Sequence, residues 1–224
     1  MKLFLVRNGE TLWNHENRLQ GHRDSPLTID GKKQVQQLAE LLKSQKIDVA
    51  YASDLGRAID TSREILKLHP KVALIQRKEL RERSHGIVEG LTQADVFKKY
   101  PKLQDERIKN KFLFKNPKGE SYADTLERLK PFLDELRQKH FSQNVLLISH
   151  AAINRILMGI CLNLSEEKIL EIHQPHDCVY VIENADSSPS VSQITPSGVQ
   201  AELFKRNPKQ KPEFEEDDAG FDDE

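Results

Sequence analysis

Two arginines and a histidine each follow a short apolar stretch of the chain. Arg7 comes directly after LFLV, Arg57 comes five residues after VAYA, and His150 comes directly after NVLLIS. Guanidinium groups bind phosphate through paired charge-assisted hydrogen bonds of about 1.5–3 kcal/mol each, and free N–H groups at helix starts add to them. If the three stretches are strands of one sheet, these side chains form a site for a phosphate dianion. Taken singly, either arginine could instead be a surface salt-bridge partner.

The elements that must position these side chains alternate between strand and helix. Short apolar runs predict strands at 3–6, 49–52, 73–76, 144–149 and 178–183. Apolar residues at helical spacing predict helices at 28–44, 55–66, 92–100, 121–139 and 152–162. The pattern predicts an α/β fold with three layers, in which helices cover both faces of a mainly parallel sheet. Ligands of such sheets bind beyond the carboxyl ends of the strands, where the three side chains lie.

Charge divides the chain into a basic body and an acidic end. All 34 Lys and Arg of the 224 residues precede residue 213, against 27 of the 35 acidic residues, which leaves the body at +7. We expect one domain over 1–204 and a basic linker with a disordered acidic tail over 205–224. A basic body suits an anionic substrate or a polyanion. The tail could compete weakly for the mouth of an anion site, or serve only solubility.

Several classes of protein are excluded by what the chain lacks. Its apolar runs are too short for a membrane span, and Cys161 and Cys178 form no CxxC pair, which favours a reduced, cytoplasmic compartment. The chain has no P-loop, GxGxxG, GxSxG or HExxH motif, and His173 with His176 makes only a weak metal site. We therefore expect no metal, no cofactor, no nucleic acid and no membrane partner. The oligomeric state cannot be read from the sequence.

A set of motifs runs along the chain in this order: LVRNGETLWN, LTIDGKKQ, YASDLGRAIDTS, LRERSHGIVEG, the GES of NPKGESYADTLERL, and LLISHAAINR. In kind and order they resemble the motifs of the histidine phosphatase superfamily, which includes the phosphoglycerate mutases. With Asn8 read as histidine, the first motif is similar to the Arg-His-Gly-Glu/Thr signature of that family. The resemblance spans about residues 1–200 and implies a phosphoglycerate mutase-like fold.

The resemblance implies a role for each matching position. Position 8 would be the histidine that attacks phosphorus and becomes phosphohistidine. Glu82 would protonate the leaving oxygen and then activate water. The transferring phosphoryl group would be held by Arg7, Asn14, Arg57 and His150. Further substrate contacts would come from Gln20, Gly21, Arg83 and Ala151.

A basic segment between Glu82 and His150 is the candidate for substrate choice. If RIKNKFLFKNPKGES folds over the pocket, as the corresponding segment does in the family, its cations would surround the substrate. Those cations are Arg107, Lys109, Lys111, Lys115 and Lys118. A solvated run of charge is the competing interpretation.

The departure from the family falls on the nucleophile, because the nitrogen lone pair of the Asn8 amide is delocalised and cannot attack phosphorus. The amide nitrogen can take the place of the proximal ring nitrogen of a histidine, which donates to a backbone carbonyl. Either the chain is a pseudoenzyme that binds a phosphorylated ligand, or an active phosphatase has had the histidine at position 8 replaced. We favour replacement, because Arg7, Asn14, Arg57, Glu82 and His150 are all retained.

The resemblance therefore implies a cofactor-independent phosphomonoesterase that is inert, or nearly so, with asparagine at position 8. The segment LRERSHGIVEG is most similar to the fructose-2,6-bisphosphatase-like and broad-specificity phosphatases. A phosphoglycerate mutase is the alternative, although the stretch between Glu82 and His150 is shorter than in mutases. The substrate would be a small anionic metabolite or a phosphopeptide.

Overall fold

One mixed sheet organises the computed structural model of the chain, which describes residues 1–200. Its seven strands are β1 (Lys2–Arg7), β2 (Val49–Ala52), β3 (Leu74–Gln76), β4 (Asn144–Ser149), β5 (Val179–Glu183), β6 (Ser190–Thr195) and β7 (Gly198–Gln200), in the order β3-β2-β4-β1-β5-β6-β7. The pairs β1–β4, β2–β4 and β2–β3 are parallel, whereas β5, β6 and β7 pair antiparallel. The predicted α/β fold with a largely parallel sheet is confirmed. The linker and acidic tail predicted for 205–224 lie outside the described residues.

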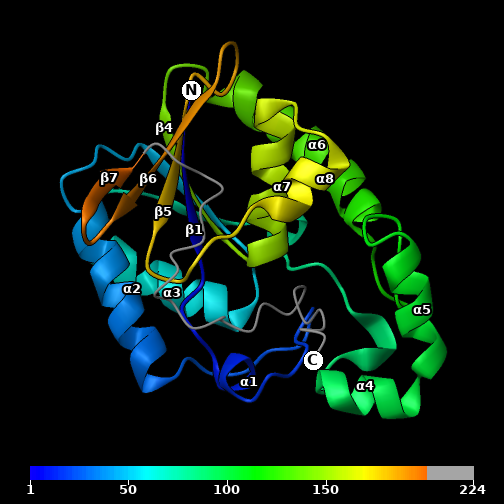
Figure 1. The fold of residues 1–224 in the computed structure, drawn as a ribbon. Coiled ribbons are helices and arrows are strands. Elements are labelled where there is room, and N and C mark those ends of the chain that lie inside the picture. Colours follow the sequence, from blue (N-terminus) through cyan, green and yellow to red (C-terminus); the bar gives the residue numbers. More distant parts are fainter. Residues whose placement is uncertain (201–224) are drawn as a thin grey trace.

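Helices cover both faces of the sheet (Figure 1). The helices are α1 (Leu12–His15), α2 (Ile29–Leu42), α3 (Gly56–Leu66), α4 (Gln93–Lys99), α5 (Pro101–Lys109), α6 (Tyr122–Lys139), α7 (Ala151–Leu162) and α8 (Glu166–Glu171). Helices α2 and α3 pack on one face around Phe4 and Val6, and α6 and α7 pack on the other around Leu3 and Leu5. Because β1 is buried on both faces, its run of apolar residues is continuous rather than alternating.

The predicted helix starts agree with the capping chemistry of the sequence. Thr28 accepts a hydrogen bond from the Gly31 amide at the start of α2, and Ser121 forms a capping box with Asp124 at the start of α6. A side-chain cap satisfies one of the amides that the first turn leaves unpaired, and it contributes about 1 kcal/mol. Within residues 1–200, no helix is long and apolar enough to cross a membrane.

Five of these helices and strands were not predicted from the sequence, and one of them is α1, a single turn of four residues. Helix α5 has no buried residue, so it lacks the apolar stripe by which a helix is recognised. Helix α8 is a six-residue helix that is too short to show a period. Strands β6 and β7 extend the sheet beyond β5. Strand β6 is rich in polar residues, β7 has only three residues, and neither has a fully buried side chain.

A bidentate ion pair joins helix α6 to Arg77, the residue directly before the 3-10 helix η1 (Lys78–Leu80). Arg77 donates through both terminal nitrogens to the Glu135 carboxylate at 2.8 Å each. Arg77, followed by Lys139, lowers the pKa of Glu135 to about 2.

Replacing Glu135 by glutamine should destabilise the protein by about 1 kcal/mol at neutral pH, because the pair is partly solvated and screened. A carboxyl whose folded pKa is depressed stabilises the fold above its unfolded pKa, and that contribution is lost as pH falls toward 2. Urea unfolding should therefore show a larger difference between the two proteins at pH 7 than at about pH 3. An equal difference at both values would contradict this assignment.

Candidate active site

The carboxyl ends of the parallel strands bring the predicted residues into one pocket. Arg7 ends β1 and Asn8 follows it, Arg57 lies in the first turn of α3 after β2, and His150 caps α7 after β4. One pocket is lined by Arg7, Asn8, Asn14, Gln20, Arg57, Glu82, His150, Ala151 and His176. Eight of the ten residues proposed from the sequence line it, and the other two, Gly21 and Arg83, are close neighbours of lining residues.

The Arg57 guanidinium is buried and holds the loop that follows Gln20. Its Nη2 donates to the carbonyl of Gly21 at 2.9 Å, and its Nη1 donates to the carbonyl of Arg23 at 2.8 Å and to Asp24 at 3.1 Å. The side chain of Arg57 is only 2% exposed. Gly21 therefore does not line the pocket, but its backbone carbonyl holds the guanidinium of Arg57 in place.

Arg7 is held from the segment that precedes β5. Its Nη1 donates to the carbonyl of Gln174 at 2.8 Å. The Gln174 side chain donates to the carbonyl of Leu5 at 3.0 Å and accepts from Asn154 of α7 at 2.7 Å. One buried glutamine thus ties together β1, α7 and the arginine, and nothing in the sequence singled it out.

The Asn8 amide is fixed by two hydrogen bonds whose directions are determined by chemistry. Its Nδ2 donates to the carbonyl of Gly9 at 2.9 Å. This is the hydrogen bond to a backbone carbonyl that the sequence predicts for an amide nitrogen in the place of a proximal ring nitrogen. Its Oδ1 therefore faces His150 Nδ1 at 2.9 Å, and that ring nitrogen must carry the proton. The other ring nitrogen of His150, Nε2, is buried and has no hydrogen-bond partner among residues 1–200.

His176 is a lining residue that sequence reasoning placed in a weak metal motif and not in this pocket. Its Nδ1 donates to the carbonyl of Asn8 at 2.5 Å, and the side chain is almost fully buried. Because β5 runs antiparallel to β1, the residues before β5 lie at the carboxyl end of β1. Over residues 1–200, the structure holds no group of three or more His, Cys, Asp or Glu placed to bind a metal ion.

Glu82 lines the pocket from a loop between η1 and the 3-10 helix η2 (Gly86–Val88). Its Oε1 accepts from the Arg83 amide at 2.8 Å, and its Oε2 lies 3.5 Å from the Ala152 amide at the start of α7. Glu82 as a whole residue is 7% exposed. It is thus a buried carboxyl beside the cations of the pocket, a position that suits proton transfer to a bound ester.

A second cavity adjoins the pocket. Its lining includes Leu19 and Arg83, whose chain neighbours Gln20 and Glu82 line the first pocket. Its polar and charged lining residues are Arg83, His85, Gln93, Gln104, Arg107, Lys111 and Asn116. Of the basic segment predicted to surround a substrate, Arg107 and Lys111 line this cavity, whereas Lys109, Lys115 and Lys118 are exposed and do not.

Anion binding to this pocket should take up a proton. Burial, followed by the charges of Arg57, His22 and Arg7, lowers the pKa of His150 well below its ordinary value, so the ring is neutral at pH 7. Its Nε2 then presents a lone pair and can bond to an anion oxygen only when protonated. Sulfate, which carries no proton in this range, should bind up to about tenfold more tightly per pH unit as pH falls from 8.

The increase in sulfate affinity should cease below the pKa of His150 in the free protein, because the ring is then already protonated before sulfate binds. Calorimetry in buffers of different ionisation enthalpy should report uptake of about one proton. The charged and titratable groups that line the pocket with the ring are Arg7, Arg57, Glu82 and His176, and the charges of His22 and Arg128 also act on it. A His150→Gln variant should bind sulfate with little pH dependence; pH-independent binding by the parent protein would refute the assignment.

Residues 3–195 match the family model described as histidine phosphatase superfamily (branch 1). A 6-phosphofructo-2-kinase/fructose-2,6-bisphosphatase of Caenorhabditis elegans is 36% identical over 159 residues, which are 70% of this chain and 33% of that protein, so the chain spans about a third of that relative. Phosphoserine phosphatase 1 of Hydrogenobacter thermophilus is 33% identical over 168 residues, 75% of this chain and 79% of that protein. Among solved structures, Bacillus stearothermophilus YhfR superposes with a TM-score of 0.77 at 26% identity, covering 89% of this chain and 98% of that one.

Proposed function

Because the chain belongs to branch 1 of the histidine phosphatase superfamily, we propose that its pocket binds the phosphoryl group of a small phosphate ester and that the scaffold is that of a phosphomonoesterase. One observation carries the proposal: Arg7, Arg57, His150 and Glu82 line a single pocket around position 8. The cations can stabilise the negative charge of the phosphoryl group during its transfer, and the carboxyl can donate a proton to the leaving oxygen.

The proposed reaction has two steps when position 8 is histidine. The distal ring nitrogen attacks phosphorus, the bond to the ester oxygen breaks, and Glu82 gives its proton to that oxygen. Water then attacks the phosphohistidine and gives its proton to Glu82, which releases phosphate and restores both groups. Asn8 supplies the hydrogen bond to Gly9 but no attacking atom, so the Asn8 form should bind the ester without turning it over.

The retained site favours a replaced nucleophile over a pseudoenzyme. A chain that only binds a phosphorylated ligand needs the arginines, but it has no use for a buried acid. Glu82 nevertheless accepts a hydrogen bond from the Arg83 amide and lies 3.5 Å from the Ala152 amide at the start of α7. We infer that the scaffold is organised for turnover and that Asn8 interrupts it.

The cationic side chains of the second cavity favour a substrate with a second anionic group. A substrate that reaches from the phosphate pocket past Arg83 would meet Arg107 and Lys111, which suit a second anionic group. The names of two relatives fit this chemistry, since fructose 2,6-bisphosphate carries a second phosphate and phosphoserine carries a carboxylate. We therefore place a small metabolite with two anionic groups ahead of a phosphopeptide.

This substrate class can be tested in the Asn8→His protein. Replacing Arg107 and Lys111 by glutamine should lower kcat/KM for fructose 2,6-bisphosphate by about 10- to 100-fold for each charge-assisted hydrogen bond that is removed. Turnover of p-nitrophenyl phosphate, which has no second anionic group, should hardly change. Lys109→Gln is the matched control, because this exposed lysine lies on the same segment outside the cavity. An equal decrease with both substrates would argue against the second anion site.

A phosphoglycerate mutase remains the alternative enzyme. A mutase would transfer the phosphoryl group back to the organic product, whereas a phosphatase transfers it to water. Incubating the Asn8→His protein with phosphoglycerate and a bisphosphoglycerate primer separates the two. Release of phosphate with no isomerised phosphoglycerate is the expected result.

A further inference from the structure

The loop that carries Glu82 has no regular secondary structure of its own. It runs between η1 and η2, where no helix or strand ladder fixes the backbone. Its position therefore depends on side chains that reach it from other elements. Two of these come from the start and the second turn of α6: Glu120, which precedes the helix, and Arg128 within it. Neither lines the phosphate pocket.

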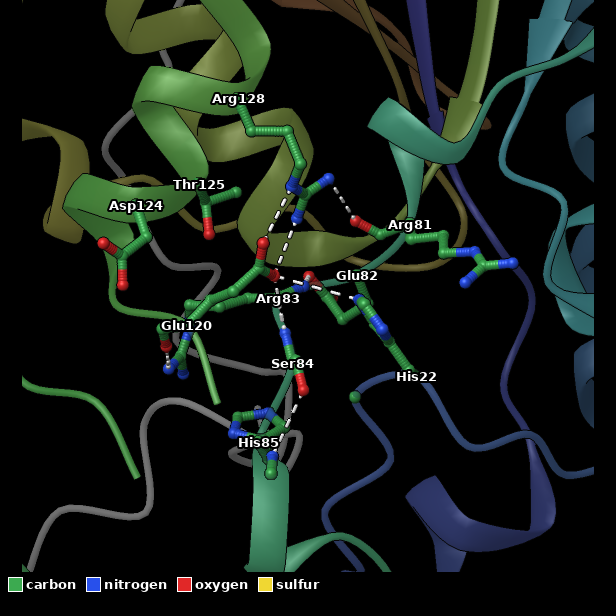
Figure 2. Close-up of polar contacts among 12 residues, drawn as sticks. His22, Arg81, Glu82, Arg83, Ser84, His85, Glu120, Asp124, Thr125 and Arg128 are labelled. Carbon is green, nitrogen blue, oxygen red and sulfur yellow. Dashed lines mark hydrogen bonds and ion pairs between the residues drawn. The ribbon is translucent and has the colours of Figure 1, made fainter. Parts of the chain in front are cut away.

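Arg128 holds the backbone on the amino side of Glu82. Its Nη1 donates to the carbonyl of Glu79 at 2.6 Å and to the carbonyl of Arg81 at 3.1 Å. Its Nε and Nη2 each donate to the Glu120 carboxylate at 2.9 Å. The guanidinium thus connects the residue directly before Glu82 to a carboxylate on the other side of the loop (Figure 2).

Glu120 holds the backbone on the carboxyl side of Glu82. Its Oε2 accepts from the Ser84 amide at 2.9 Å, and its own backbone amide donates to the Ser84 carbonyl at 2.8 Å. Its carbonyl accepts from Arg83 Nη1 at 3.1 Å. Figure 2 shows Arg128 joined to Glu120 and Glu120 joined to Ser84, with Glu82 next to them. The ion pair therefore brackets the residue that carries the proposed acid.

A second carboxylate, Glu89, secures the far end of the same loop. Its Oε1 accepts from the hydroxyl of Ser84 at 3.1 Å and from the amides of His85 and His22 at 3.0 Å each. This carboxylate ties the loop of Glu82 to the segment that carries Gln20. Glu89 thus anchors the loop beyond Glu82, and Asp54 pairs with the side chain of Arg81 before it, whereas the α6 pair contacts the backbone on both sides of Glu82.

We propose that the Glu120–Arg128 pair positions the Glu82 carboxyl for proton transfer to the leaving oxygen. The inference rests on the proposed function, because it requires Glu82 to act as the acid. Glu82 takes its orientation from the Arg83 amide, which belongs to the bracketed loop, and from the start of α7. A shift of the loop by about 1 Å would separate the carboxyl from the ester oxygen and cost on the order of 10²-fold in rate.

The test uses esters whose need for an acid differs. In the Asn8→His protein, Glu120→Gln and Arg128→Met should each lower kcat/KM for glycerol phosphate, a poor leaving group, by about 10- to 100-fold. For p-nitrophenyl phosphate, whose leaving group departs without a proton, kcat/KM should change less than about threefold. Arg128→Lys supplies a second variant where Arg128→Met fails to fold.

A double substitution shows whether the pair acts through Glu82. In an Asn8→His, Glu82→Gln background, adding Glu120→Gln should cause no further decrease with glycerol phosphate, because the group it positions is already gone. Glu135→Gln is the matched control, since it breaks the other bidentate arginine pair of α6 without touching residues 81–84. It should lower stability and leave both kcat/KM values unchanged.

Failure of the inference and failure of the proposed function give different results. An inert Asn8→His protein overturns the proposed function and the inference with it. An active Asn8→His protein in which Glu120→Gln lowers turnover of both esters equally overturns the inference alone. A full further decrease in the Glu82→Gln background does the same, because the pair would then act independently of the acid.

Discussion

Replacing Asn8 by histidine is expected to raise turnover of phosphate esters by about 10⁶-fold, the size of effect seen when covalent nucleophiles are deleted from other enzymes. The pocket already contains what a histidine would need. The carbonyl of Gly9, which now accepts from the Asn8 amide, would accept from the proximal ring N–H and leave the lone pair on the distal nitrogen. The same change removes the oxygen that faces His150 Nδ1, which frees that ring to donate through Nε2 to the phosphoryl oxygens.

A covalent intermediate is the most direct evidence for this result. Mass spectrometry of the Asn8→His protein, mixed with a phosphate ester and quenched without acid, should find phosphate on residue 8. Asn8→Gln is the matched control, since it keeps an amide and supplies no nucleophile. If the Asn8→His protein is as inert as its parent on every ester tried, the phosphatase proposal is wrong and a binding protein becomes the better account.

The strand ends could be predicted from the sequence because each consists of a local pattern. The stretches LFLV, VAYA and NVLLIS are short, continuous apolar runs, and each is followed directly by polar residues. In a parallel sheet, strand ends meet at one edge in any strand order, so Arg7, Arg57 and His150 could be brought together before the topology was known. The amide geometry of Asn8 could be predicted for the same reason, because its partner is the next residue.

His176 and Gln174 could not be placed because their position depends on strand direction. They precede β5, and in a parallel strand that would put them at the opposite edge of the sheet. Since β5 pairs antiparallel with β1, its first residue, Val179, lies opposite Val6 at the carboxyl end. The signal was present in the HQPH segment directly before an apolar run, but only the pairing of β5 gives that segment its place in the pocket.

The structural role that Arg57 has besides phosphate binding could not be predicted from the sequence either. Arg57 was predicted to hold the phosphoryl group, yet much of its guanidinium holds the Gly21–Asp24 loop. Such tertiary contacts join segments more than 30 residues apart, and no local pattern encodes them. One consequence is that truncating Arg57 would disturb the loop as well as anion binding, so Arg7 is the cleaner position at which to test the phosphate site.

Replacing Glu82 by glutamine in the Asn8→His protein should lower kcat/KM for an alkyl phosphate by about 10²- to 10⁴-fold, the usual contribution of a positioned acid or base. Glutamine fills the same space and can still accept from the Arg83 amide, so loop geometry and anion affinity should persist. The decrease should therefore fall on esters with poor leaving groups, which need a proton to depart, and nearly vanish in kcat/KM for p-nitrophenyl phosphate. The limb of the pH–rate profile that follows protonation of the acid should disappear with it. Unchanged turnover of the alkyl ester would move the acid elsewhere, and His85 would be the first candidate, because the three hydrogen bonds to Glu89 already commit that carboxylate to the loop.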